Sequence, residues 1–343
     1  MKTRIARPED RREISDFILR TKTSNLYHDY AWMIIIEETF HQKCFYLICE
    51  NSEKKISGVL PLVQLNSFIF GNYMVSMPYF NYGGVCAESG EARDLLVDAG
   101  IDIAGKVGAK HIEFRQQEPL GNGMPVKTRK ASMRLCLPDD PRQLWNSFPS
   151  KLRSQIRGTE KKGLIAKIGK KEGLDDFYTV FSINMRDLGT PVYPKSFFEN
   201  ILDKFSDNAW ICTVYKGNVP LASGFLLSSK NGIEIPWASS IRKFNHLSPN
   251  MLLYWNCLEF SCQSGYSVFD FGRSTSGEPT YKFKEQWGAT PVQLNWHYWL
   301  KNGKSIPEIS PANPRYELAI KIWKKLPLPV TRILGPRIVK NLP

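Results

Sequence analysis

The second half of the chain carries an ordered series of strands interrupted by one well-marked helix, and this order constrains the fold more than any other feature. Four apolar residues recur at helical spacing between Leu252 and Cys262. Ser248 stands at the N-cap position, Pro249 at the first helical position and Gly265 just beyond the end, where these residue types are favoured. The order predicts a mostly antiparallel sheet in which one helix connects late strands. The predicted strands are residues 210–215, 221–227, 233–238, 268–272 and 292–300, with a hairpin turn at 216–218 between the first two.

The first half of the chain contains the same kinds of element in a similar order. Apolar patterning predicts helices from Pro8, over Trp32–Phe40 and up to Gly108, with strands at 44–49, 56–65, 74–77, 111–115 and 132–137. After residues 138–141 the pattern restarts with helices at 141–148, 151–162, 174–188 and 195–205. We therefore expect an α/β (α+β) protein of two tandem domains, 1–140 and 141–305, each a mixed, mostly antiparallel sheet flanked by helices. A basic, proline-containing tail at 306–343 would follow, with a helix from Asn313 and Pro314 and then a proline-interrupted segment.

Composition excludes several classes of protein. The longest apolar runs are far shorter than the roughly 20 residues that a bilayer-spanning helix needs, so we expect a cytoplasmic protein. The seven cysteines include no CxxC pair, and the five histidines are scattered. These patterns predict neither a disulfide framework nor a metal site, and we propose no metal.

The net charge of +13 implies an anionic partner, which could be nucleic acid, an acidic lipid surface or a phosphorylated small molecule. The predicted helix 151–162 places Arg153, Arg157 and Lys161 on one face, with Lys151 near them. Such a stripe fits a phosphate-bearing ligand. A solvated helix face is the alternative.

Charged residues and glycines are concentrated between residues 268 and 288, directly after a predicted strand. Strand alternation places Asp270 on the face shared with Val268 and Gly272. A lysine from the following stretch could project a cation toward this face and stabilise the oxyanion of an acyl intermediate. The alternative is a solvated loop with surface charges. The candidate residues of this segment are Asp270, Arg273, Tyr281, Lys282, Lys284 and Glu285.

Two tyrosines outside this segment are further candidates for lining a cleft. Tyr82 lies in Asn81-Tyr82-Gly83-Gly84, where the glycines would allow close approach of the backbone to a ligand. Tyr193 lies between Pro191 and Pro194. A turn between strands and a buried loop anchor are the respective alternatives.

Several longer stretches together carry a family resemblance: PYFNYGG at 78–84, HIEFRQ at 111–116, KLRSQIR at 151–157, NMRDLGTPVYPKSFF at 184–198, FDFGRSTSGEPTYKFKEQWGA at 269–289, and NPRY with IWKKLPLP at 313–329. They resemble the FemAB-related proteins associated with PEP-CTERM/exosortase systems, and the resemblance covers nearly the whole chain. It implies two tandem domains of the GNAT type and transfer of an acyl or aminoacyl group to an amine. In the Fem enzymes the donor is aminoacyl-tRNA and the acceptor is a peptidoglycan precursor.

The resemblance also assigns roles to residues. The phenylalanine-lysine pair of the Fem pattern corresponds to Phe283-Lys284, so Lys284 becomes the preferred cation for the donor or the developing charge. The basic Fem pattern maps to Lys151, Arg153 and Arg157, which would contact acceptor phosphate or tRNA. In our hypothesis the acceptor amine attacks the acyl carbonyl directly, and Asp270 positions or deprotonates that amine.

The acyl donor stays open between aminoacyl-tRNA and acyl-coenzyme A, and no permanently bound cofactor is expected. Ordinary GNAT enzymes hold coenzyme A with a glycine-containing loop, whereas the corresponding residues 242–247 contain no glycine. Fem enzymes proper often carry a coiled-coil arm, and no long heptad run is present here. These departures weigh against coenzyme A and against tRNA respectively.

The tail from Leu318 combines six basic residues with apolar ones and has no acid. This composition fits peripheral contact with the inner face of an anionic membrane, where a phosphorylated or lipid-linked envelope precursor could be the acceptor. A C-terminal packing segment is the alternative. Two rival functions remain for the whole chain: a coenzyme-A-dependent N-acyltransferase acting on a sugar or amino acid in exopolysaccharide assembly, and a non-catalytic nucleic-acid-binding protein.

Overall fold

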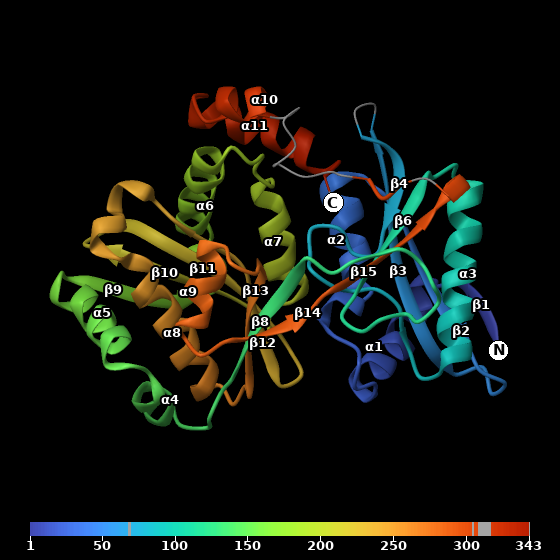
Figure 1. Ribbon diagram of the computed structural model, residues 1–343, viewed down its shortest axis with the longest axis horizontal. Coiled ribbons are helices and arrows are strands. Elements are labelled where there is room, and N and C mark those ends of the chain that lie inside the picture. Colours follow the sequence, from blue (N-terminus) through green and yellow to red (C-terminus); the bar gives the residue numbers. More distant parts are fainter. Residues whose placement is uncertain (68–69, 304, 308–316, 343) are drawn as a thin grey trace. The chain divides into compact units, whose positions relative to one another are not determined.

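The computed structural model describes residues 1–67, 70–303, 305–307 and 317–342. The chain divides into two compact units, each containing one sheet with helices packed on it (Figure 1). Unit 1 consists of Met1–Lys130, Gln293–Ile309 and Ile338–Pro343, and unit 2 of Ala131–Val292 and Ser310–Arg337.

The sheet of unit 1 has the strand order β1-β2-β3-β4-β6-β15-β7, and the short β5 pairs with β3. β4 and β6 are parallel, with Met74 opposite Ile112, while the other pairs in this sheet are antiparallel. The strands are β1 (Lys2–Ile5), β2 (Lys43–Glu50), β3 (Ile56–Ser67), β4 (Gly71–Val75), β5 (Cys86–Ala87), β6 (His111–Gln116), β7 (Val126–Lys127) and β15 (Asn295–Leu300), and the α-helices are α1 (Arg11–Arg20), α2 (Ala31–Phe40) and α3 (Gly90–Lys106).

Helix α3 forms the crossover between the parallel strands β4 and β6. Its first turn is capped by Ser89, whose Oγ accepts a hydrogen bond from the Ala92 amide at 3.2 Å. Its buried side packs on β2, β3 and β6, where Leu96 and Ile103 join one apolar core with Leu60. The predicted helix that ends at Gly108 is thereby confirmed.

Unit 2 has the strand order β14-β8-β13-β12-β11-β10-β9. The strands are β8 (Lys130–Cys136), β9 (Leu164–Gly169), β10 (Ala209–Lys216), β11 (Val219–Ser229), β12 (Gly232–Ser240), β13 (Val268–Thr275) and β14 (Thr290–Gln293). The α-helices are α4 (Pro141–Ser147), α5 (Ser150–Lys161), α6 (Leu174–Leu188), α7 (Lys195–Lys204), α8 (Pro249–Gln263), α9 (Pro279–Glu285), α10 (Glu317–Trp323) and α11 (Leu328–Val339).

Helix α8 is the crossover between the parallel strands β12 and β13, as α3 is between β4 and β6. It begins at Pro249 and is followed by Gly265 with φ 79°, which agrees with the predicted ends. Ten of its fifteen residues are buried, because it packs against four strands and against α4 and α5. Gly217, with φ 58°, makes the predicted hairpin turn between β10 and β11.

The predicted strand 292–300 is two strands in the structure, and they belong to different sheets. β14 pairs with β8, whereas β15 lies between β6 and β7 in the sheet of unit 1. Tyr298 of β15 donates a hydrogen bond to the buried Glu113 carboxylate at 2.7 Å, and the Arg115 guanidinium stacks on the Trp296 ring at 4.4 Å. These contacts hold β15 against β6 and explain why it is not a strand of the second sheet.

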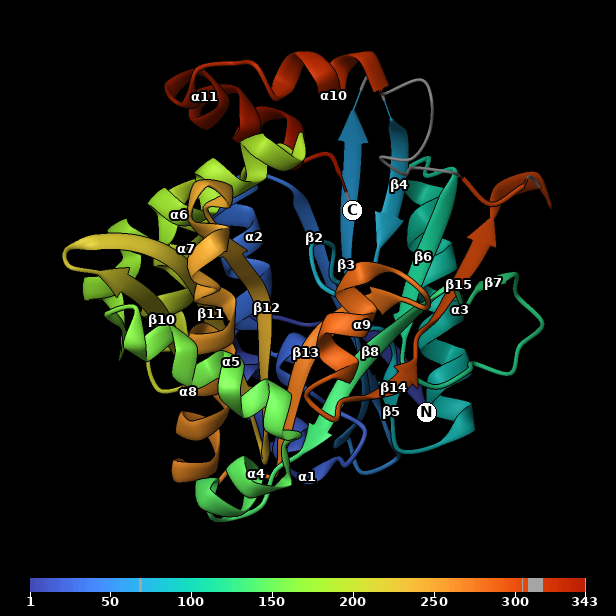
Figure 2. The same ribbon diagram turned by 60° about the vertical axis from the view of Figure 1, so that its left-hand side comes forward.

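The tail forms two helices where the sequence predicts one helix and a proline-interrupted segment. The expected start of the first helix, at Asn313 and Pro314, lies outside the described residues, and α10 is described from Glu317. α11 is helical through Pro336. Figure 2 shows α10 and α11 beside one end of α6 in unit 2.

Three further properties concern the described part of the chain. No helix there is long and apolar enough to cross a membrane. All seven cysteines, each of which is described, are free thiols. In the described part of the chain, no group of histidine, cysteine and carboxylate side chains has the arrangement of a metal site.

Candidate functional site

The segment after β13 contains a helix that the sequence pattern does not reveal. A turn follows β13, and α9 then begins at Pro279, a residue suited to the first helical position. Phe283 packs against the Tyr254 ring of α8 at a centroid distance of 5.1 Å, which anchors α9 on the core of unit 2. This anchoring directs the neighbouring Lys284 back toward β13.

Lys284 is the buried cation of the site. Its Nζ donates hydrogen bonds of 2.9 Å to the Gly272 carbonyl and 2.9 Å to the Arg273 carbonyl, and its side chain is only 8% exposed. Burial lowers the pKa of Lys284 to about 8, although the charges of Asp270 and Glu234 act in the opposite direction. The lysine is therefore still mostly protonated at neutral pH.

Asp270 lies within a network of donors on β13, an inner strand of the sheet. Its carboxylate accepts from Ser132 Oγ at 2.5 and 2.7 Å, from Arg134 Nε at 3.1 Å and from the Gly272 amide at 2.8 Å. Glu234 of β12 stands opposite Asp270 in the strand register and is also buried. The acidic pair and the cations of Lys284 and Arg134 offset each other's charge, which a buried site requires.

This arrangement can stabilise a developing negative charge. An ammonium has three N–H donors, and the two carbonyls occupy two of them. No third partner of Lys284 Nζ is present among the described residues, so one N–H remains for an anionic oxygen, in a setting of low dielectric where such a bond is strong. The contacts of Asp270 favour a positioning role for it, because its oxygens already accept from three groups.

The other predicted residues of this segment lie close to Lys284 in the chain and differ in exposure. Arg273 follows Gly272 in β13; its side chain is exposed, and its carbonyl accepts from Lys284. Tyr281 is half-buried on α9, whereas Lys282 and Glu285 are exposed. These two exposed charges fit the surface alternative named above.

The predicted cationic stripe lies on α5, in another part of unit 2. α5 packs on α8 and β9, and three strands separate β9 from β13 in the sheet. Arg157 is exposed and its guanidinium lies 5.3 Å from the centre of the Trp145 ring, while Arg153 is half-buried. Lys151 and Lys161 are exposed. Among the described residues, no hydrogen bond or ion pair joins this stripe to Lys284.

Tyr193 and Tyr82 are packing residues in their own units. Tyr193 stacks with Phe181 at a centroid distance of 6.2 Å, and its carbonyl accepts a hydrogen bond from the Tyr178 hydroxyl. Tyr82 is buried in unit 1, where its ring meets the Tyr27 ring edge-on at 5.3 Å. The contacts of Tyr193 agree with its alternative, a buried loop anchor, and the position of Tyr82 between β4 and β5 agrees with its alternative, a turn between strands. The role of both tyrosines as site residues stays a prediction.

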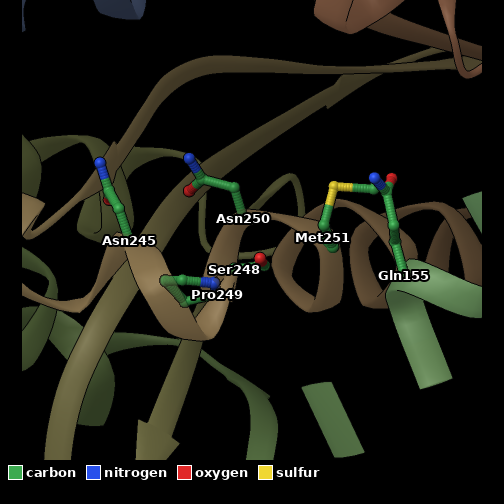
Figure 3. Close-up of a pocket in the computed structure, with 6 residues that line it drawn as sticks. All are labelled: Gln155, Asn245, Ser248, Pro249, Asn250 and Met251. Carbon is green, nitrogen blue, oxygen red and sulfur yellow. The ribbon is translucent and has the colours of Figure 1, made fainter. Parts of the chain in front are cut away.

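A pocket of about 160 Å³ opens at the N-terminal end of α8. Figure 3 shows Gln155 of α5 and Met251 of α8 pointing toward one another, with Asn250 between Met251 and Asn245. Few amides are available here, since Pro249 has no N–H and the Met251 amide donates to the Ser248 carbonyl at 3.0 Å. A ligand phosphate would thus find fewer donors than a helix start usually offers.

Three residues of the Lys284 site were missed from the sequence: Ser132, Arg134 and Glu234. A signal existed for the first two, because they are the polar members of the predicted strand 132–137 at a spacing of two. Glu234 likewise interrupts an apolar predicted strand. Recognising that they meet Asp270 requires the order of the strands, which no local pattern provides.

Comparisons with known proteins agree with the fold. Residues 147–285, which include α5 to α9 of unit 2, match the family model of the acetyltransferase (GNAT) domain. No curated protein matches the chain at a significant level.

Several solved structures have a similar fold. The crystal structure of FemX matches with a TM-score of 0.67 and 15% identity, over 93% of this chain and 100% of that one. The C-terminal domain of a putative lysylphosphatidylglycerol synthetase from Agrobacterium fabrum matches with a TM-score of 0.57 and 14% identity, over 86% and 92% of the two chains. A tandem GNAT protein from the clavulanic acid biosynthesis pathway matches with a TM-score of 0.56 and 10% identity, over 89% and 99%. The predicted fold of two tandem GNAT-like domains is confirmed.

Proposed function

We propose that the chain is an acyltransferase that moves an acyl or aminoacyl group from an activated donor to an amine. The observation that carries the proposal is the buried ammonium of Lys284, held by two backbone carbonyls with one donor left over. The GNAT family match over residues 147–285 and the likeness to FemX support a transferase.

The reaction would proceed by direct attack without a covalent enzyme intermediate. The acceptor amine attacks the donor's carbonyl carbon, and the new C–N bond forms as negative charge develops on the carbonyl oxygen. Lys284 donates its remaining N–H to that oxygen. The intermediate collapses when the bond to the leaving oxygen or sulfur breaks, and the proton lost by the amine ends on that leaving atom. Asp270 keeps β8 and β13 together through Ser132 and Arg134.

The donor in this proposal is aminoacyl-tRNA or acyl-coenzyme A, and the start of α8 favours the first. A pyrophosphate bound at a helix start is held by free backbone amides. Here Pro249 lacks one, and the amides of Met251 and Ser248 are already bonded to carbonyls. Isothermal titration with acetyl-coenzyme A and with charged tRNA distinguishes the two donors. Binding of acetyl-coenzyme A alone would favour the rival N-acyltransferase.

We further propose that the acceptor is a phosphorylated or lipid-linked precursor of the cell envelope, related to peptidoglycan or exopolysaccharide. Similarity to FemX and to the lysylphosphatidylglycerol synthetase domain supports an acceptor of this class, as does the resemblance to FemAB-related proteins of PEP-CTERM systems. Lys151, Arg153 and Arg157 of α5 would meet phosphate of the acceptor or of tRNA, away from the reacting carbonyl. A cytoplasmic location at the inner face of the membrane agrees with such an acceptor.

Mass spectrometry of envelope precursors tests this function. Cells that express the wild-type chain should contain a precursor heavier by one acyl or aminoacyl group than the same precursor in cells lacking it. Lys284→Met, which keeps the volume and removes the charge, should abolish this mass difference. Lys282→Met, on the exposed side of the same helix, should preserve it.

Full transfer by Lys284→Met with the fold intact would contradict the role of Lys284. An unmodified precursor pool together with tight duplex binding of steep salt dependence would instead favour a nucleic-acid-binding protein.

A further inference from the structure

Apolar side chains accumulate on the exposed side of the C-terminal helices of unit 2. Twelve large hydrophobic side chains are exposed among the described residues, and four of these fall within residues 318–334. A fifth, Leu188, ends α6 next to Gly189, where an added Cβ would lie 2.5 Å from Ile320 of α10. We call these five residues the C-terminal patch: Leu188, Leu318, Ile322, Ile333 and Leu334.

The opposite sides of these helices are already used for packing. Trp323 of α10 is buried, and so is Thr331 of α11. Arg332 donates to Ser182 Oγ of α6 at 2.9 and 3.1 Å. A Cβ on Gly335 would lie 2.8 Å from the Val192 backbone nitrogen, so α11 is pressed closely on the loop after α6. Leu318, Ile322, Ile333 and Leu334 therefore lie on the sides of α10 and α11 that this packing leaves exposed. Figure 2 shows the two helices beside α6.

Basic residues alternate with the patch residues along the chain. Residues 317–342 contain six lysines and arginines and one acid, Glu317, which pairs with Lys321 at 2.6 Å. Lys324 and Lys325 are exposed, and no carboxylate in the described part of the chain lies within ion-pair distance of either. An apolar face bordered by unneutralised lysines is typical of segments that lie in the interface of an anionic bilayer.

We propose that the C-terminal patch docks on a membrane surface that carries anionic phospholipid headgroups. Its leucines and isoleucines enter the boundary between headgroups and acyl chains, and Lys324 and Lys325 contact the phosphates. RNA would also attract the lysines, but it offers nothing that removes the aliphatic side chains from water. The attachment is peripheral, since no helix of the described residues can span a bilayer.

Co-sedimentation of the full chain with vesicles tests the proposal independently of any transfer reaction. The protein should sediment with vesicles rich in phosphatidylglycerol, less so at high salt, and should stay in solution with phosphatidylcholine alone. Ile322→Ser with Ile333→Ser should remove most of the binding. Lys324→Gln and Lys325→Gln should each weaken it about fivefold.

Matched control variants come from unit 1. Leu19→Ser replaces a leucine that is 72% exposed on α1, and Lys106→Gln neutralises an exposed lysine on α3. Both should sediment like the wild type. Equal sedimentation with the two kinds of vesicle, or patch variants that bind as well as the wild type, would overturn the proposal. The proposal would also be overturned if the protein bound tRNA and the Ile322→Ser and Ile333→Ser changes abolished that binding.

Discussion

Glu234 on β12 and Asp270 on β13 lie directly opposite each other across a parallel pair of strands, and both carboxyl groups are buried. Two adjacent buried acids repel unless cations are close to them. Arg134 supplies one at 3.1 Å from Asp270, and both acids raise the pKa of Lys284 against the effect of its burial. The acidic pair thus helps to keep the Lys284 ammonium charged at neutral pH.

Asp270→Asn should lower the pKa of Lys284 below about 8, because the substitution removes a negative charge that favours the ammonium. If transfer requires that ammonium, the alkaline limb of the pH profile of kcat/KM should move down by about one pH unit. The control Glu285→Gln removes an exposed charge next to Lys284 and should leave the limb in place. An alkaline limb that does not move in Asp270→Asn would show that Lys284 does not govern the rate.

The sequence predicted only those residues of the candidate site that lie together in one segment of the chain. Strand alternation assigned the face of Asp270, and the Phe283-Lys284 pair indicated the lysine. Ser132 and Arg134 come from a strand 138 and 136 positions earlier in the chain. Alternation shows which face a side chain is on, but not which strand lies beside it. α9 was not predicted because seven residues are too few to show helical periodicity.

Lys284 should also make the stability of the protein depend on pH. The pKa of Lys284 is about 8 in the folded chain, whereas an unperturbed lysine, as in the unfolded chain, has a pKa of 10.5. Between these two pH values the unfolded chain therefore binds more protons than the folded chain. The free energy of unfolding of the wild type, relative to Lys284→Met, should therefore rise by about 2–3 kcal/mol from pH 8 to 10.5. Urea unfolding at several pH values measures this. Parallel curves for the two proteins would show that the folded pKa is not lowered.

Tyr298→Phe tests the position of β15. The Tyr298 hydroxyl donates to Glu113, and Arg115 and Tyr298 together hold the pKa of Glu113 below its ordinary value although burial alone would raise it. Without this donor, a buried oxygen of the Glu113 carboxylate loses its hydrogen bond, and the free energy of unfolding should fall by about 1–3 kcal/mol. Acid unfolding should begin at a higher pH, because the pKa of Glu113 rises.

The control for Tyr298→Phe is Tyr266→Phe, which removes the same atom from a half-buried ring. No hydrogen bond to the Tyr266 hydroxyl is present among the described residues, so this change should be nearly neutral. Equal stability of the two variants would contradict the contact between β15 and β6.

The elements of the fold were more predictable than their assembly. α8 carries cap signals at both ends, and Gly217 marks a hairpin, so local chemistry sufficed for them. The assignment of β15 to the sheet of unit 1 depends on Glu113 and Arg115, nearly two hundred residues earlier. A period of two predicts that a strand exists without identifying its neighbours.

Gly335→Ala should loosen α11 from unit 2. The added Cβ would lie 2.8 to 2.9 Å from the backbone nitrogen and oxygen and from Cγ1 of Val192, and the backbone atoms cannot move aside cheaply. We expect the free energy of unfolding to fall by about 1–3 kcal/mol. Proteolysis of the C-terminal helices should be faster. The same substitution at Gly158 of α5 meets no atom within 4 Å and should stabilise its helix by about 0.5–1 kcal/mol. If the two variants resist protease equally, α11 is not packed on Val192.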